Sequence, residues 1–153
     1  MHIWVDADAC PLVIKEVLFR VAARTKTPVT LIANQMLWVP PSPWIRSEQV
    51  PSGFDVADRR IVELAQSGDL VVTADIALAA LVIANGALVL DHRGDLIDQS
   101  TIDARLTIRD FMASLREGGV ATGGPSAFSA KDTKCFADQL DRLLARMARQ
   151  KRR

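Results

Sequence analysis

The sequence lacks the features of a membrane-spanning, secreted or disulfide-rich protein. Its longest uncharged apolar run, residues 76–90, is interrupted by Asn85-Gly86 and is too short to cross a bilayer. The N-terminus has no basic flank followed by an apolar stretch, and two distant cysteines give no disulfide framework. We therefore expect a cytoplasmic protein with no membrane segment.

Glutamate is also scarce, because 14 of the 18 acidic residues are aspartate. Aspartate is poor inside helices and is favoured at helix caps, in turns and at strand ends. Many of these acids should therefore lie where secondary-structure elements meet.

Positive charge is concentrated near the C-terminus. Residues 142–153 contain six lysines and arginines and no acid, so subtracting them from the net charge of +1 leaves about −5 for the rest. This basic C-terminal tail on a mildly acidic body suits either a polyanion held at one edge of the domain or a solvated chain end. The sequence leaves both interpretations open.

The length and the 49% hydrophobic content predict a single globular domain, residues 1–153. Apolar runs predict strands near 3–5, 29–33, 70–73 and 87–90. Residues 36–53 contain four prolines and suit an irregular or edge segment that could hold a short strand around 45–50, and residues 96–97 could form a hairpin. Helical spacing predicts helices near 11–24, from 55 or 58 to 67, 76–84, 102–116 and from about 129 onward. Strands that are apolar throughout and alternate with helices are typical of a parallel sheet covered on both faces. We expect an α/β fold with three layers (α/β/α) and a mainly parallel sheet of four or five strands.

Aspartates follow several of the predicted strands. Asp6 and Asp8 follow the first strand, Asp75 and Asp91 follow two later strands, and Asp58 lies on the first turn of a helix. In open parallel sheets, ligands bind outside the carboxyl ends of the strands, so three or more acids should converge there. Their pKa values would be raised unless a hard cation neutralised them, and Mg²⁺ or Mn²⁺ prefers such oxygen ligands. Zinc is disfavoured because no His or Cys run has suitable spacing.

A divalent cation held by acids at a sheet edge can support the hydrolysis of phosphate esters. We expect Asp6, Asp58 and Asp75 to be catalytic and to bind the cation, with Asp8 or Asp55 nearby. Each aspartate taken alone could instead be a helix cap or a turn residue, and this alternative suits Asp55 and Asp91 best.

Four stretches of the chain resemble a known family. They are "VDADACP" (5–11), "AN" (33–34), "GFDVADRRIVELAQSGDLVVTADIALA" (53–79) and "GGPSAF" (123–128). Over nearly its whole length the chain resembles the YaiI/YqxD family of bacterial proteins, which is similar to PIN-domain nucleases. The PIN pattern of a first-strand aspartate, a helical acid and Thr-x-Asp is matched here by Asp6, Asp58 and Thr73-Ala74-Asp75. The resemblance implies a PIN-like domain that cleaves RNA or single-stranded nucleic acid with Mg²⁺ or Mn²⁺. Asp8 is not part of that pattern.

Candidate substrate contacts come from the ends of other elements. Asn34 at a strand end, Thr73 beside Asp75, and Arg116 beside the glycine-rich loop 118–124 could contact a nucleic acid. A turn residue is the alternative for Asn34 and a surface salt bridge is the alternative for Arg116. The oligomeric state is open, and a homodimer is possible.

Two other functions remain open. The first is a PIN-like domain that binds nucleic acid or regulates without catalysis, with structural acids. The second is a phosphatase like the haloacid dehalogenases, in which Asp6 of "DAD" would be the nucleophile. That family also needs a lysine and an acidic pair after a later strand, whereas "GD" at 68–69 precedes its strand.

Overall fold

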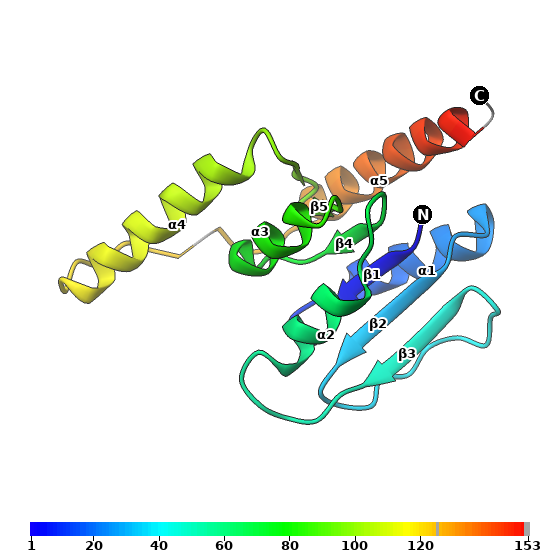
Figure 1. Ribbon diagram of the computed structural model, residues 1–153, viewed down its shortest axis with the longest axis horizontal. Coiled ribbons are helices and arrows are strands. Elements are labelled where there is room, and N and C mark those ends of the chain that lie inside the picture. The colour runs from blue at the N-terminus through cyan, green and yellow to red at the C-terminus, as the bar shows by residue number, and fades with distance from the viewer. Residues whose placement is uncertain (125, 152–153) are drawn as a thin grey trace.

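The computed structural model describes residues 1–124 and 126–151 as a single α/β fold (Figure 1). The strands are β1 (Ile3–Asp6), β2 (Val29–Ala33), β3 (Ile45–Gln49), β4 (Leu70–Val72), β5 (Leu88–Leu90) and β6 (Leu96–Ile97). The helices are α1 (Leu12–Thr25), α2 (Val56–Leu64), α3 (Ile76–Ala84), α4 (Ile102–Glu117) and α5 (Ala130–Lys151). Among the described residues, none of these helices combines the length and the apolar character needed to cross a bilayer.

All six strands form one sheet in the order β3-β2-β1-β4-β5-β6. Strands β1 to β5 are parallel to one another, and of the described strands only β6 is antiparallel, to its neighbour β5. The mainly parallel sheet is therefore confirmed, but the expected count of four or five strands is too low. The two short segments near 45–50 and 96–97 both pair fully, because the prolines that made residues 36–53 ambiguous lie outside β3.

Helices cover both faces of the sheet, as the three-layer prediction requires. One hydrophobic cluster joins α1 and α5 to Ile3 and Val5 of β1. The other joins α2, α3 and the start of α4 to Val71 of β4 and Val89 of β5. Because side chains alternate along a strand, Trp4 packs in the second cluster and Asp6 faces the same side as Trp4, toward α2 and α3.

Helix α2 is shorter than the sequence predicts, ending at Leu64 instead of near Ser67. The carboxylate of Asp69 explains the difference, because it accepts a hydrogen bond from the backbone N–H of Gln66 at 3.0 Å. Ala65 is already extended, and Gly68 completes the turn with a φ of 88°. A local side-chain bond thus competes with the helix and stops it early.

A tight turn between β5 and β6 holds α5 against the sheet. The Asp91 carboxylate accepts hydrogen bonds from the backbone N–H groups of Arg93 at 2.9 Å and Asp95 at 3.0 Å. Gly94 has a φ of 91°, and a Cβ built on it would lie 2.6 Å from the backbone carbon of Cys135. The turn therefore contacts the α5 backbone so closely that only glycine fits.

Helix α4 extends away from the sheet (Figure 1). It packs against α3, and of its residues only Ile102 is buried. Helix α2 also has one buried residue, Ile61, but six of its nine residues are half-buried, whereas eleven of the sixteen residues of α4 are exposed. Helix α4 is therefore the least covered of the described helices.

Candidate active site

Three aspartates meet at the carboxyl edge of the parallel strands. Asp6 is the last residue of β1, and Asp75 follows β4 as the N-cap of α3. Asp58 lies in the first turn of α2, which packs on the same side of the sheet. We call Asp6, Asp58 and Asp75 the acidic cluster. The order of the strands brings them together, since β1 and β4 are adjacent in the sheet.

The hydroxyl of Thr73 links two members of the acidic cluster. It donates a hydrogen bond to Oδ2 of Asp6 at 2.9 Å and accepts one from the backbone N–H of Asp75 at 3.0 Å. Thr73 is 1% exposed, so this bridge is shielded from water. Thr73 thus fixes the position of Asp6 relative to the start of α3, and it acts as a positioning residue.

Asp75 caps α3 with one carboxylate oxygen. Its Oδ1 accepts hydrogen bonds from the backbone N–H groups of Ala77 at 2.9 Å and Leu78 at 3.2 Å. In the hydrogen bonds formed by the described residues, Asp6 uses only Oδ2 and Asp75 only Oδ1. Each carboxylate therefore keeps an oxygen that can bind a ligand.

The electrostatics show that the acidic cluster is close enough to interact. Burial raises the pKa of Asp6, the Thr73 hydrogen bond opposes that rise, and the charges of Asp75 and Asp8 add to it. Burial also raises the pKa of Asp58 to about 6, with further increases from Asp6, Asp75 and Asp55. Across residues 1–124 and 126–151, none of these carboxylates forms an ion pair with a lysine, arginine or histidine. The cluster thus concentrates negative charge with no cationic side chain in direct contact, while Arg59 and Arg109 line the adjoining hollow.

Two members of the acidic cluster, Asp58 and Asp75, line a hollow of about 850 Å³ between α2, α3 and α4, whereas Asp6 is not among its lining residues. Its lining includes Asp55, Asp58, Asp75, Phe54, Leu81 and Arg109. Phe54 is 91% exposed and Leu81 is 55% exposed, so apolar surface lies beside the acids. The hollow is open to solvent and large enough for a polymeric substrate to approach.

The arrangement of the side chains limits how a metal ion could be bound. In the described ranges, no group of three or more His, Cys, Asp or Glu side chains stands close enough to form a cation cage. Such a cage is not what Mg²⁺ needs, since it keeps several waters and is usually bound by one or two carboxylates plus substrate phosphates. The free oxygens of Asp6 and Asp75 fit that smaller donor set.

The structure gives Asp8 and Asn34 a role in joining two loops. The backbone N–H of Asn34 donates to both carboxylate oxygens of Asp8, at 2.9 Å and 3.2 Å. This bond ties the segment after β1 to the segment after β2. Asp8 contributes to the charge around Asp6, but its oxygens are already used by this contact.

The other predicted residues lie at different places. Asp55 is the N-cap residue of α2, with a left-handed φ of 62° and no side-chain capping bond, and it lines the hollow. Asp91 stabilises the turn before β6, in agreement with the turn alternative. Arg116 lies in the last turn of α4 and is not among the residues that line the hollow. Two other arginines line it: Arg59 of α2 and Arg109, which lies two turns before Arg116 on α4. The sequence offered no signal to choose either of them over Arg116.

Comparisons with known proteins agree on one family. The family model described as "Uncharacterized BCR, YaiI/YqxD family" matches residues 4–146. A UPF0178 protein of Bordetella avium is 62% identical over 98% of this chain and 97% of its own length. A UPF0178 protein of Cronobacter sakazakii is 61% identical over 98% of this chain and 99% of its own length. No solved structure gives a significant match.

Proposed function

Because the chain belongs to the YaiI/YqxD family and carries the PIN-like pattern of Asp6, Asp58 and Thr73-Ala74-Asp75, we propose that it is a metal-dependent nuclease. The reaction is the hydrolysis of phosphodiester bonds in RNA or single-stranded nucleic acid, in the cytoplasm. The observation that carries this proposal is the acidic cluster: three carboxylates, two of them with raised pKa values, converge with no cationic partner among the described residues.

Each residue of the acidic cluster has a role in this proposal. Asp6 and Asp75 hold Mg²⁺ or Mn²⁺ through their free oxygens, and Thr73 keeps those two carboxylates in register. When bound, such a cation activates water, neutralises phosphoryl oxygens and stabilises the leaving alkoxide. Asp58 completes the set by binding the cation or by orienting water through its carboxylate. Phe54 and Arg109 on the wall of the hollow offer a base-stacking surface and a positive charge to the substrate.

Calorimetry with Mn²⁺ tests the site directly. We expect the wild type to bind Mn²⁺ and the Asp75→Asn variant to bind it at least about tenfold more weakly, because one ligand charge is removed. An asparagine oxygen can still accept the bonds from Ala77 and Leu78, so the α3 cap persists. Asp91→Asn is the matched control, since Asp91 stabilises a turn, and its affinity should equal that of the wild type. Equal affinity in wild type and Asp75→Asn would contradict the proposal.

The pH dependence of stability gives a second test, performed in EDTA. The pKa of Asp58 is about 6 in the folded protein, against 3.8 for an unperturbed aspartate. A raised carboxylate pKa means that the native state binds the proton more tightly, so this stabilisation is complete below about pH 4 and is lost as the pH rises through about 6. Asp58→Asn removes that loss. The variant should therefore gain thermal stability over wild type by a larger margin at pH 7.5 than at pH 4, as followed by circular dichroism.

An equal margin at both pH values would show that Asp58 does not titrate differently in the folded state. Asp55→Asn is the control, because Asp55 is exposed and lies on the same hollow. The difference in thermal stability between Asp55→Asn and the wild type should vary less with pH than the difference for Asp58→Asn.

A non-catalytic domain that binds nucleic acid remains the second candidate. The observation that favours it is the absence, within the described ranges, of a three-ligand cation cage. Salt-sensitive RNA binding without cleavage when Mn²⁺ is supplied would support it over the nuclease. An internally labelled single-stranded RNA distinguishes the two, since cleavage in its interior is expected only of the nuclease.

A further inference from the structure

A second charged surface lies on the face of the sheet that α1 and α5 cover, opposite the face covered by α2 and α3. It consists of Arg24, Lys26, Arg142, Arg146, Arg149 and Lys151, which we call the basic ridge. Arg24 and Lys26 come from the C-terminal end of α1 and the residue that follows it, and the other four lie on α5. Figure 1 shows the end of α5 beside the N-terminus of the chain, where β1 begins.

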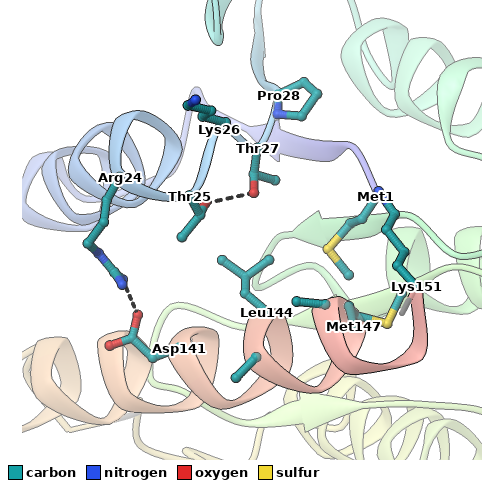
Figure 2. Close-up of a pocket in the computed structure, with 12 residues that line it drawn as sticks. Met1, Arg24, Thr25, Lys26, Thr27, Pro28, Asp141, Leu144, Met147 and Lys151 are labelled. Carbon is teal, nitrogen blue, oxygen red and sulfur yellow. Dashed lines mark hydrogen bonds and ion pairs between the residues drawn. The ribbon is translucent and has the colours of Figure 1, made fainter. Parts of the chain in front are cut away.

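One side of the basic ridge is a groove between α1 and α5, shown in Figure 2. Its volume is about 380 Å³, and Arg24, Lys26 and Lys151 are among the residues that line it. Its one acidic lining residue is Asp141, which pairs with Arg24 at 2.6 Å. Lys26 and Lys151 therefore leave the groove with a net positive charge.

The other side of the basic ridge is a groove between α5 and β6. Its volume is about 310 Å³, and Arg142, Arg146 and Arg149 line it. These arginines recur every three or four residues and so lie on one face of the helix, spanning about 10 Å along its axis. In the described part of the chain none of the three forms an ion pair with a carboxylate. Arg142 contacts only the amide oxygen of Gln139, at 3.5 Å.

We propose that the basic ridge binds the phosphodiester backbone of a nucleic acid without the help of a divalent cation. Four of its six residues are arginines, whose planar guanidinium groups form paired hydrogen bonds with phosphate. Three of them are in a row along α5 and form no ion pair among the described residues. The carboxylate of Asp138 lies within electrostatic range of Arg142 but is already paired with Lys134, so a repeating anion can satisfy the row. The large apolar side chains that are exposed elsewhere in the protein are absent from the described part of this ridge. A polyanion therefore fits it better than a membrane, into which such side chains would insert.

The basic ridge extends the proposed function by supplying a second contact for the nucleic acid. It is distinct from the acidic cluster because α1 and α5 cover one face of the sheet, whereas α2 and α3, which carry Asp58 and Asp75, cover the other. No residue lines both the hollow beside Asp58 and Asp75 and either groove of the ridge. Backbone binding at the ridge involves none of the cluster's carboxylates. Binding and cleavage can therefore be tested separately.

Fluorescence anisotropy with a labelled 20-nucleotide single-stranded RNA in EDTA tests the basic ridge. The wild type should bind, with affinity falling steeply as salt rises. In R142Q/R146Q/R149Q we expect at least a tenfold loss of affinity at low salt. The slope of log Kd against log salt should fall by about 2, since each lost phosphate contact on a single strand contributes about 0.7.

The matched control is K15Q/R46Q/K131Q, which removes the same charge outside both grooves. Its affinity and salt slope should stay close to those of the wild type, and circular dichroism should show that all three proteins are folded. Equal losses in both triple variants would mean that only net charge matters and would overturn the proposal. So would tighter binding to anionic vesicles than to RNA, or RNA binding that requires Mn²⁺ and disappears in Asp75→Asn. RNA binding in EDTA without any cleavage in Mn²⁺ would support the ridge while contradicting the nuclease.

Discussion

Asp6→Asn should lose phosphodiester cleavage by about 100-fold or more and should raise the thermal unfolding midpoint in EDTA. The activity falls because a cation ligand is removed, and even partners one shell away from a metal are typically worth about 10–100-fold. The stability rises because burial, Asp75 and Asp8 all disfavour the charged form of Asp6. An asparagine carries no charge and its oxygen can still accept the Thr73 hydrogen bond. Cleavage of labelled RNA in Mn²⁺ and thermal denaturation measure the two effects.

Asp69→Asn is the matched control for the stability effect, since it makes the same chemical change at the opposite end of the strands. Asp69 accepts hydrogen bonds from the backbone N–H of His2, the indole N–H of Trp4 and the backbone N–H of Gln66, each at 3.0 Å. An amide cannot accept all three, so this variant should lose about 1–3 kcal/mol of stability. Full nuclease turnover by Asp6→Asn would remove Asp6 from the proposed site.

Gly94→Ala should destabilise the fold by about 3 kcal/mol, which lowers the unfolding midpoint by roughly 6–12 °C. Two effects add at this position. The φ of 91° is unfavourable for any residue with a Cβ, and that Cβ would lie 2.6 Å from the backbone carbon of Cys135 and 2.8 Å from the nitrogen of Phe136. Neither neighbour can rotate away, because both are backbone atoms of α5 and Phe136 is fully buried.

Gly68→Ala separates these two effects. Gly68 has a similar φ of 88°, but a Cβ there meets nothing within 4 Å. Its variant should lose only about 1 kcal/mol, the cost of the backbone conformation alone. Thermal or urea denaturation of both variants measures the difference. Equal losses would show that α5 shifts away from the β5–β6 turn at little cost.

The alternation of strands and helices was predictable because the inner parallel strands are largely apolar and buried, β2 and β4 at every residue. Val29–Ala33 and Ile76–Ala84 were predicted to the residue, since continuous apolar runs end there at Asn34 and Asn85. The end of α2 could not be predicted to the residue, because it depends on the hydrogen bond between Asp69 and Gln66 and not on apolar spacing. The number of strands was also underestimated, since the pairing of a short edge strand depends on its neighbour.

The convergence of Asp6 and Asp75 could be expected because each follows a buried strand of a parallel sheet. The hydrogen bonds around them could not be predicted, since the bridge through Thr73 and the bond between Asn34 and Asp8 depend on side-chain orientation. The choice of Arg109 over Arg116 depends on how α4 lies across α3, which no local pattern determines. Arg152 and Arg153 of the predicted basic tail lie outside the described residues.

The acidic cluster and the basic ridge lie on opposite faces of the sheet, which gives the protein an uneven charge distribution across the sheet. In the field of a polyanion such a molecule rotates before contact, so that α5 arrives first and the carboxylates point away. This torque acts within about one Debye length, roughly 8–10 Å at physiological ionic strength. The first encounter should therefore be oriented, and a polynucleotide must then bend or reach around the domain before its backbone meets the carboxylates.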